Sequence, residues 1–461
     1  MLLNSNKYDK LSLVVINFKV ERRFCMKFFG FRGGVHPPEN KIQTENMAVE
    51  ELKAPKMLYI ALLQHIGSPL DPTVAIGDKV LKGQKIADSQ AFMSSPIHSP
   101  VSGTIKKIEE HVFPLMGRIK TIIIENDEQE TWAELPKIEN WEAADKKDLL
   151  AMIREKGIVG IGGASFPTHI KLNPPADAKI DTLLLNGAEC EPYLNSDNRL
   201  MLEHPEKIIN GIQIIKKILG INNAIVGIEE NKPEAIASMK KAAEGTGIQI
   251  APLKTKYPQG GEKQLIKAVL DRQVPSGKLP SAVGVVVQNT GTAAAIYDGI
   301  VNGIPLIEKV VTVSGKAIAT PKNVKIAIGT PFSYLLDYCG VNREIVDKLV
   351  MGGPMMGMAQ FSEDAPVIKG TSGLLALTRE ETNPYKPKSC IGCGKCVEAC
   401  PMGLEPLMFA RLAAFEQWEQ LGQFSLMDCI ECGSCAYICP ANRPLTEAIK
   451  IGKSKLRAMK K

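Results

Sequence analysis

The pattern of hydrophobic and polar positions changes along the chain. Between residues 55 and 135, short apolar runs alternate with tight-turn signals such as Gly77-Asp78 and Lys82-Gly83. This pattern predicts the short strands of a small all-β domain. From about residue 145, apolar runs of strand length alternate with amphipathic stretches of helix length. Such alternation predicts a mostly parallel sheet that binds ligands at the carboxyl ends of its strands.

The expected elements follow from these runs. In the all-β region we predict short strands within 58–65, 74–87 and 96–109. In the α/β region we predict, in chain order, a helix at 146–157, a strand at 181–188, a helix at 205–219, a strand at 222–230, a helix at 232–245, a strand at 248–255, a helix at 261–272 and a strand that leads into a helix at 282–300. Gly157 is the predicted C-cap of the first helix.

Three further stretches have their own patterns. Residues 28–53 are rich in Gly, Pro and polar residues, which predicts an irregular, extended arm. Residues 305–342 predict two short strands, a turn and a helix. Residues 404–422 predict one helix, and its apolar positions recur at helical spacing, as expected of a core-facing stripe: Leu407, Met408, Leu412, Phe415 and Trp418.

Composition narrows the class of protein. A chain of 461 residues with 44% hydrophobic and 23% charged residues has an ordinary globular composition, and its length predicts about three domains. A net charge of +6 argues against a dedicated nucleic-acid binder and suits acidic protein partners or an anionic membrane surface. No apolar run approaches the length needed to span a bilayer. Residues 1–25 lack a signal-peptide cleavage site and are interpreted as an extension or disordered leader.

The most specific chemical signal is a pair of cysteine runs near the C-terminus. Each follows the pattern Cys-x-x-Cys-x-x-Cys-x-x-x-Cys-Pro, which resembles bacterial two-cluster ferredoxins, where the fourth Cys of each run ligates the other cluster. The resemblance implies one [4Fe–4S] cluster on Cys390, Cys393, Cys396 and Cys439, and a second on Cys429, Cys432, Cys435 and Cys400. Zinc is the competing metal, although its sites usually pair two short Cys-x-x-Cys knuckles.

A disulfide framework is a poorer alternative, because a reducing compartment would not maintain it. The remaining three of the eleven cysteines, Cys25, Cys190 and Cys339, are isolated in the sequence. We interpret them as free thiols of a cytoplasmic protein. The cysteine runs therefore predict a protein that moves single electrons.

A second candidate site is the glycine-rich stretch GIVGIGGASFPTHIKL at 157–172. Gly160, Gly162 and Gly163 would let backbone N–H groups approach an anion closely. A glycine-rich loop alone is weak evidence, and a structural turn is an equal alternative. The spacing also differs from the G-x-G-x-x-G of a dinucleotide-binding strand–turn–helix unit.

This stretch, with LLLNGAECEP after it, resembles the flavin-binding subunit of respiratory complex I and its hydrogenase relatives. The resemblance implies an FMN loop of Gly160, Gly162, Gly163 and Ala164, an FMN contact by Lys171, and a flavin hydrogen bond by Asn186. It implies that the acids Glu189 and Glu191 lie near the flavin and nicotinamide. Two further segments, QGGEKQLI and VQNTGT, resemble family motifs and imply cofactor-binding roles for Gly261, Glu262, Asn289 and Thr290.

The sequence departs from that family at three positions. Ile161 replaces a loop Arg, Ala188 replaces an Asp, and Lys263 stands where a second Glu is expected. These changes predict a less acidic flavin site. Upstream, V-x-x-GD-x-V-x-x-GQ-x-IA…PIHSPVSGTI resembles the biotinyl/lipoyl-carrier barrel, but the hairpin tip DSQAFMSSP offers Met93 and no Lys, so we expect the barrel without the carrier function. His65 and His98 are interpreted as packing or surface residues.

Taken together, FRGGVHPPENK, LQHIGSP, GGASFPTHIKL, NGAECEPYLNSDNRLM and the cysteine runs resemble RnfC, the peripheral C subunit of the Rnf ion-translocating electron-transport complex. The resemblance implies a multidomain α/β protein that binds FMN, NAD(H) and two [4Fe–4S] clusters. It implies docking at the cytoplasmic face of the cell membrane, onto membrane-embedded and ferredoxin-like Rnf subunits. The module at 305–342 resembles the SLBB (soluble-ligand-binding β-grasp) fold.

We therefore expect five segments along the chain. These are a leader and arm at 1–54, a barrel-sandwich domain at 55–135, an α/β FMN- and NAD(H)-binding domain at 136–303, an SLBB-like module at 304–370 and a helical two-cluster domain at 371–461.

The expected activity is that of one component of an ion-translocating ferredoxin:NAD+ oxidoreductase. A flavin between nicotinamide and the clusters would exchange hydride on one side and single electrons on the other. Two alternatives stay open. One is the diaphorase subunit of a soluble hydrogenase or formate dehydrogenase, and the other is a flavin-free electron-relay adaptor.

Overall fold

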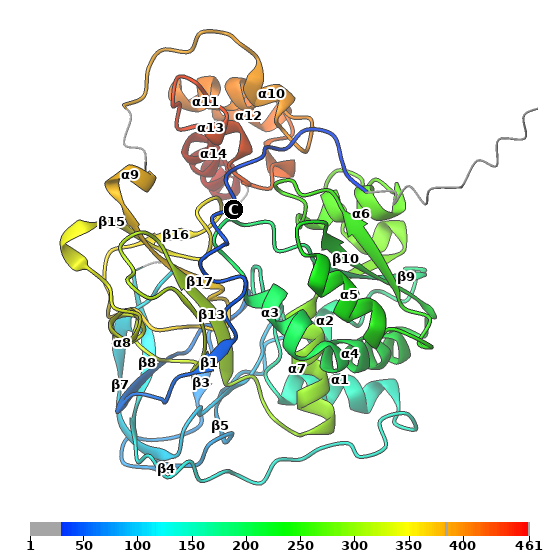
Figure 1. Ribbon diagram of the computed structural model, residues 1–461, viewed down its shortest axis with the longest axis vertical. Helices are drawn as coiled ribbons and strands as arrows, with labels where there is room; N and C mark the ends of the chain where they lie inside the picture. The colour runs from blue at the N-terminus through cyan, green and yellow to red at the C-terminus, as the bar shows by residue number, and fades with distance from the viewer. Residues whose placement is uncertain (1–28, 116, 383–385, 460–461) are drawn as a thin grey trace, which may run out of the picture.

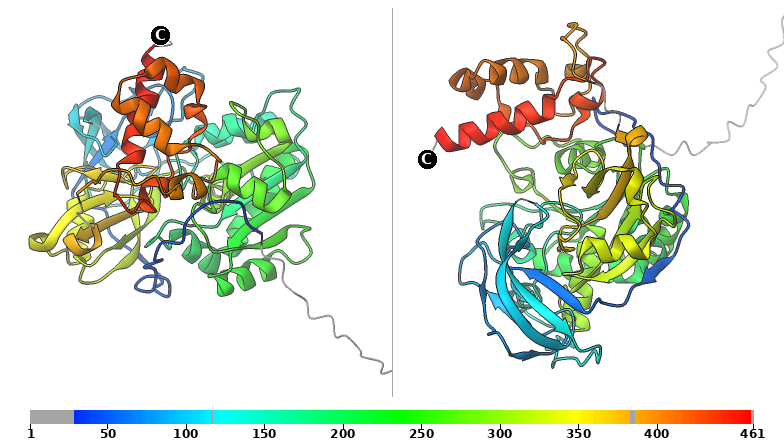
Figure 2. Two further views of the ribbon diagram at one scale, coloured as in Figure 1. Left: turned by 90° about the horizontal axis from the view of Figure 1, so that it is seen from above. Right: turned by 90° about the vertical axis from the view of Figure 1, so that its left-hand side faces the viewer.

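The computed structural model describes residues 29–115, 117–382 and 386–459. Figure 1 shows a barrel in cyan and blue, an α/β unit in green, a second sheet in yellow and a helical unit in orange and red. The leader and Cys25 lie outside the described residues. The helical unit lies on the side of the molecule opposite the barrel, and the two sheets lie between them (Figures 1 and 2).

The barrel-sandwich is built from two small sheets with strand orders β2-β8-β7-β4 and β3-β5-β6. Their strands are β2 (Met57–Ala61), β3 (Asp71–Pro72), β4 (Lys79–Val80), β5 (Lys85–Asp88), β6 (Ile97–His98), β7 (Gly103–Val112) and β8 (Arg118–Asn126). The apolar side chains of the predicted runs fill its interior, among them Leu58, Ile86 and Ile105. Of the two roles expected for His65 and His98, packing or surface, their burial favours packing.

The α/β unit contains the parallel sheet that the alternation predicted, with strand order β11-β10-β9-β12. Leu183, Leu184 and Leu185 in β9 are all fully buried, as expected for a strand with both faces covered. The elements are α1 (Lys146–Glu155), α2 (Thr168–Lys171), β9 (Thr182–Gly187), α3 (Ser196–Glu203), α4 (Pro205–Leu219), β10 (Asn223–Glu229), α5 (Pro233–Ala242), β11 (Gln249–Leu253), α6 (Glu262–Leu270), β12 (Val285–Asn289) and α7 (Thr290–Val301).

The order of these strands creates a topological switch point. From β9 the chain adds β10 and then β11 on one side, and later returns to place β12 on the other side of β9. Open α/β sheets bind ligands in the crevice at such a reversal, beyond the carboxyl ends of the strands. The carboxyl ends of β9 and β12 are therefore the place to look for a ligand site.

The second sheet has six strands in the order β1-β14-β13-β17-β15-β16. Its elements are β1 (Val49–Glu51), β13 (Glu308–Ser314), β14 (Lys322–Ala327), α8 (Phe332–Tyr338), β15 (Val346–Met351), β16 (Met358–Gln360) and β17 (Gly373–Thr378). The two strands and the helix predicted at 305–342 are present. Since β17 pairs with β13, this unit continues to residue 378.

The arm before the barrel is extended, as predicted, but it also takes part in both sheets. Phe29 forms a bridge to Leu253 beside β11, and β1 pairs with β14 of the second sheet. In Figure 1 the dark-blue arm passes beneath the helical unit on its way from the green sheet to the yellow one. The arm therefore ties the two sheets together on the side that faces the helices.

The helical unit contains α10 (Lys395–Glu398), α11 (Pro406–Ala414), α12 (Trp418–Gln423), α13 (Ser434–Tyr437) and α14 (Leu445–Met459), whereas the short α9 (Arg379–Thr382) lies against β15 and β17 of the second sheet (Figure 1). The single helix predicted at 404–422 is wrong. It breaks between α11 and α12, where Glu416 has a φ of 53°, and Phe415 is 69% exposed rather than in the core. Among the described residues, no helix is both long and apolar enough to cross a bilayer.

Candidate functional site

Asn186 and Asn289 mark the switch point of the parallel sheet. They are register partners at the ends of β9 and β12, and Asn289 Nδ2 donates to the carbonyl oxygen of Asn186 over 3.4 Å. Asn289 Oδ1 accepts from Gly291 N over 2.8 Å and so caps α7. Asn186 Nδ2 donates to Gly260 O over 2.8 Å. The structure thus brings two predicted flavin-site residues together at the expected edge.

The glycine-rich loop lies over the same edge. Ile161 N donates to Thr292 Oγ1 on the first turn of α7 over 2.9 Å, and Gly160 N donates to Phe166 O over 2.8 Å. Gly162 has a φ of 80°, and a Cβ there would lie 3.0 Å from Asn289 Nδ2. Gly163 has open space around it. The loop is therefore fixed at its base and exposed from Gly162 to Ala164.

These features fit the phosphate group of a flavin nucleotide. The exposed residues Gly162 to Ala164 lie beside the N-terminus of α7, whose helix dipole favours an anion there. Thr290 is fully buried at that terminus, and its Oγ1 has no hydrogen-bond partner in the described part of the chain. The hydroxyl therefore lies beneath the surface of the site, and its predicted contact with the cofactor stays a prediction.

Lys171 and Glu262 lie opposite each other at another rim of the site. Lys171 Nζ donates to Glu262 Oε1 over 2.7 Å, with side chains that are 32% and 39% exposed. Gly261 precedes Glu262 as the N-cap of α6, and its N–H donates to Pro258 O. Two residues predicted from separate motifs therefore form one ion pair that faces solvent.

Glu189 occupies a different position from the one its predicted role suggests. Its carboxylate accepts from Asp197 N over 2.8 Å and from Asn198 N over 3.0 Å, at the N-terminus of α3. Ser196 Oγ also donates to it, over 3.2 Å. The carboxylate therefore stabilises a helix N-terminus, and its contact with nicotinamide stays a prediction.

Glu191 joins the α/β unit to the second sheet. Its carboxylate accepts from Met355 N over 3.0 Å and from Met356 N over 2.8 Å. Burial raises the pKa of Glu191 to about 7, although these two N–H donors act in the opposite direction. This carboxyl group therefore changes its charge close to neutral pH.

Asp197 is a buried neighbour of the predicted flavin site to which the sequence analysis gave no role. Asn289 Nδ2 donates to Asp197 Oδ2 over 2.7 Å. Burial raises the pKa of Asp197, and the neighbouring charge of Glu189 adds to the rise. Its only signal in the sequence was its place in the motif NGAECEPYLNSDNRLM, which gave no role to this residue.

The cysteines of the second predicted cluster converge. Cys400, Cys429, Cys432 and Cys435 line one small cavity. Burial raises the pKa of Cys435 to about 12, and repulsion from Cys432, Cys429 and Cys400 adds to the rise. The fourth Cys of the first run thus lies among three cysteines of the second run. Four thiols around one cavity fit the ligand set of a [4Fe–4S] cluster.

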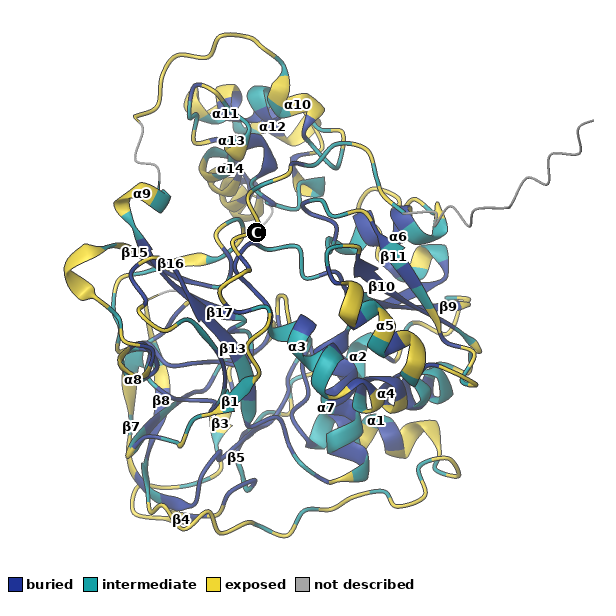
Figure 3. Ribbon diagram, viewed as in Figure 1, coloured by how far each residue is buried: buried dark blue, intermediate teal, exposed yellow. Residues whose placement is uncertain are grey.

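The other four cysteines are closer to solvent. Cys390 and Cys393 are exposed, whereas Cys396 and Cys439 are half-buried. Burial raises the pKa of Cys396, and the proximity of Cys439 contributes to that rise. In Figure 3 the segment that leads into this run arches over the helical unit and is exposed. Cys439 of the second run thus lies near Cys396 of the first, whereas the ligand set of this cluster stays a prediction.

The two runs also share a backbone pattern. Gly392 N donates to Cys390 Sγ over 3.4 Å, and Glu431 N donates to Cys429 Sγ over 3.3 Å.

Among the described residues, no three His, Cys, Asp or Glu side chains are arranged as ligands of one metal ion. A [4Fe–4S] cluster spreads its thiolates around a cube of iron and sulfide, so its ligands stand farther apart than those of zinc. Cys190 and Cys339 are free thiols, as predicted.

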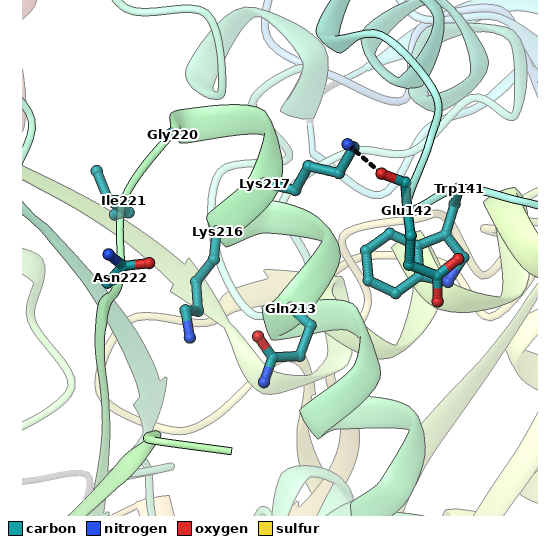
Figure 4. A pocket seen from close by; sticks show the side chains of 8 residues that line it. All are labelled: Trp141, Glu142, Gln213, Lys216, Lys217, Gly220, Ile221 and Asn222. Carbon is teal, nitrogen blue, oxygen red and sulfur yellow. Dashed lines mark hydrogen bonds between the residues drawn. The ribbon is translucent and has the colours of Figure 1, made fainter.

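A surface pocket elsewhere has no part in this chemistry. Figure 4 shows it between Trp141 and the end of α4, where Lys217 Nζ donates to Glu142 O. Asn222, which precedes β10, also lines it. The pocket therefore lies at the amino ends of the parallel strands, opposite the edge that carries Asn186 and Asn289.

Family models match the units in chain order. They are the RnfC barrel sandwich hybrid domain at residues 29–129, the Nuo51 FMN-binding domain at 153–298, the SLBB domain at 310–359 and the 4Fe-4S dicluster domain at 389–443. The fold and the two sites thus define a flavin- and iron–sulfur-binding electron-transfer protein. More particularly, the chain belongs to the RnfC family, the C subunits of ion-translocating oxidoreductase (Rnf) complexes, as its relatives show.

The identity with these relatives extends over nearly the whole chain. The C subunit of the proton-translocating ferredoxin:NAD+ oxidoreductase complex of Clostridium ljungdahlii is 50% identical over 93% of this chain and 94% of that protein. The Na+-translocating counterpart of Acetobacterium woodii is 43% identical over 94% and 98%. The C subunit of the ion-translocating oxidoreductase complex of Rhodobacter capsulatus is 43% identical over 94% and 84%. The predicted family and fold class are confirmed.

Proposed function

We propose that this chain is the NAD(H)-linked subunit of a membrane-bound, ion-translocating ferredoxin:NAD+ oxidoreductase. It exchanges hydride with NAD(H) at FMN and passes single electrons through two [4Fe–4S] clusters to or from partner subunits. The observation that carries the proposal is the pairing of two sites on one chain. A flavin-type loop covers the switch point of a parallel sheet, and four cysteines from two runs surround one cavity.

The side chains and backbone of this chain have separate tasks. FMN, when bound, supplies the exchange between two-electron and one-electron chemistry, and the clusters supply one-electron steps. The exposed loop from Gly162 to Ala164 and the N-terminus of α7 bind phosphate through backbone N–H groups. Lys171 adds a positive charge at the rim, and Asn186 and Asn289 fix the edge of the sheet.

The two cluster positions suggest their order in the electron path. Among the four cysteines that line the cavity, Cys432 and Cys435 are buried and Cys400 and Cys429 are half-buried. Cys390 and Cys393 are exposed. A cluster on the buried set is therefore placed to exchange electrons with the flavin, and a cluster on the exposed set is placed to exchange them with a partner subunit.

The names of the relatives also indicate the kind of complex to which this chain belongs. Two relatives are named for ferredoxin:NAD+ oxidoreductase activity, one proton-translocating and one Na+-translocating. We place this chain as a peripheral subunit at the cytoplasmic face, where NAD(H) is available, and assign ion translocation to membrane-embedded partners.

The test uses the purified subunit with its flavin and iron contents measured. Under anaerobic conditions, NADH should bleach the flavin absorbance, and the electron paramagnetic resonance signals of reduced clusters should follow. A protein that holds both clusters but no flavin, and that NADH does not reduce, would instead be a flavin-free relay. That result would overturn the proposed function.

A further inference from the structure

Tyr257 connects the α/β unit to the helical unit. It lies between β11 and α6 and is 1% exposed. Its hydroxyl donates to the backbone carbonyl oxygen of Cys432 over 2.8 Å, across 175 residues of sequence. Its backbone N–H and carbonyl are both paired with Val35 of the arm, over 2.9 and 2.8 Å. The position of Tyr257 is thus fixed from both ends.

Tyr257 is packed by residues from every unit except the barrel, and the carboxyl group of Glu191 also lies beside its hydroxyl. Val35, Ala399 and Cys432 pack with it as buried residues, and Cys190 and Met355 pack against this cluster. Met355 belongs to the loop after β15 of the second sheet. The contact between Tyr257 and Cys432 is therefore the centre of a buried junction between three units.

This junction continues to the edge of the parallel sheet. Gly260 N donates to Cys190 Sγ over 3.3 Å, and Gly260 O accepts from Asn186 Nδ2 over 2.8 Å. A series of direct contacts thus leads from Asn186 through Gly260 and Cys190 to Tyr257 and Cys432. It connects the flavin-type site with the cavity of the buried cysteines.

We propose that Tyr257 is a positioning residue for electron transfer between the flavin site and the cluster on Cys400, Cys429, Cys432 and Cys435. The hydroxyl holds the Cys432 loop against the α/β unit and directs the positive end of its O–H dipole toward that ligand loop. This inference rests on the proposed function and adds the residue that couples its two sites.

Two physical effects follow from this contact. Electron transfer slows steeply with distance, so a fixed loop keeps the cluster within reach of the flavin. A donor that points toward the ligand loop also stabilises the more negative, reduced cluster, and hydrogen bonding is one of the features that set cluster potentials. Removal of the hydroxyl should therefore slow the transfer and lower the potential of this cluster alone.

The experiment compares Tyr257→Phe with Tyr338→Phe in the purified holoprotein. Phe keeps the ring in the junction and removes only the hydroxyl. Tyr338 is 39% exposed on α8 and donates to Glu50 away from both sites, so it provides a matched control. Flavin and iron contents, both cluster midpoint potentials and the rates of flavin and cluster reduction by NADH are measured.

For Tyr257→Phe we expect normal flavin reduction and a fall of about tenfold in the rate of cluster reduction, equivalent to a loss of roughly 1.4 kcal/mol. One midpoint potential should fall and the other should stay. Loss of about half the iron with full flavin would support the same role, because only one cluster depends on this contact.

Equal rates and potentials in both variants and the wild type would overturn the inference. So would a joint loss of flavin and iron, since that result would make Tyr257 a general stability residue. Failure of NADH to reduce the flavin of the wild type is a separate outcome, and it would contradict the proposed function itself.

Discussion

Arg154 of α1 holds Asp88 of the barrel, with its Nη2 donating to Asp88 Oδ1 over 2.8 Å. The same guanidinium donates to Ser89 O over 2.8 Å. Asp88 and Ser89 begin the stretch DSQAFMSSP, which corresponds to the tip that presents a lysine in biotinyl and lipoyl carriers. Here the first two residues of the stretch are held against the α/β unit, so the barrel is attached to that unit at this point.

Arg154→Met should release this stretch. The substitution removes a charge-assisted pair whose side chains are 30% and 17% exposed, and hydrogen bonds of this kind stabilise by about 1–3 kcal/mol. Hydrogen exchange of the amides after Asp88 should become about tenfold faster or more. Lys137→Met removes an exposed pair and should leave this exchange unchanged. Equal protection in both variants would contradict the fastening role.

The buried carboxyl of Glu191 should make stability depend on pH. Its pKa is about 7 in the folded chain and about 4.3 when unfolded. Between these values the folded state binds more protons, so stability is fully present below the lower pKa and is lost as pH rises through the higher one. Each pH unit in this window costs up to about 1.4 kcal/mol.

Glu191→Gln should remove this dependence. We compare the thermal unfolding midpoint of the variant with that of the wild type at each pH. The substitution itself can change the midpoint at pH 5, but the difference between variant and wild type should then rise in favour of the variant up to about pH 8. For Glu139→Gln, at a side chain that is 81% exposed, the difference in unfolding midpoint from the wild type should be the same at every pH. If the difference in unfolding midpoint is also the same at every pH for Glu191→Gln, the pKa of this carboxyl is an ordinary one.

Substitutions at the adjacent glycines 162 and 163 should distinguish two effects in the flavin-type loop. One is backbone strain, and the other is contact between a new methyl group and the bound flavin. Gly162→Ala places a Cβ at a φ of 80° and 3.0 Å from Asn289 Nδ2, which should cost about 1–2 kcal/mol and lower flavin content. Gly163→Ala meets nothing within 4 Å, so the protein without flavin should keep its stability.

A flavin phosphate that rests on the loop would nevertheless be displaced by the new methyl group at position 163. We therefore expect weaker FMN binding in Gly163→Ala, measured by equilibrium dialysis, at an unchanged unfolding midpoint of the flavin-free protein. FMN binding at wild-type strength would place the phosphate elsewhere.

The sequence predicted the sheet and the ligand types because both depend on local patterns. Buried runs such as Leu183 to Leu185 and the spacing of the cysteines are visible without the fold. The contacts between units are not local. The bond from Tyr257 to Cys432 spans 175 residues, and the placement of Glu189 at α3 depends on a left-handed backbone with a φ of 46°. Neither has a signal in composition or periodicity.

The predicted helix at 404–422 failed for a similar reason. Its apolar spacing is compatible with one long helix, and nothing local forbids it. The chain instead turns at Glu416, which lets Leu412 and Leu421 pack in one core with α14. Tertiary packing outweighed the local preference for a continuous helix.

The crossed arrangement of the cysteine runs leads to the last prediction. Because Cys400 lines the cavity of Cys429, Cys432 and Cys435, Cys400→Ser should remove the cluster of the second run, although the substitution lies in the first. Iron should fall to about half, since each cluster needs four thiolates, and the spectrum of the remaining cluster should persist. Cys439→Ser should remove the other cluster, whereas Cys339→Ser, at a buried free thiol, should keep all iron. If Cys400→Ser instead lost the cluster that depends on Cys390 and Cys393, each run would hold its own cluster, and the electron path proposed through Tyr257 would end at a different group.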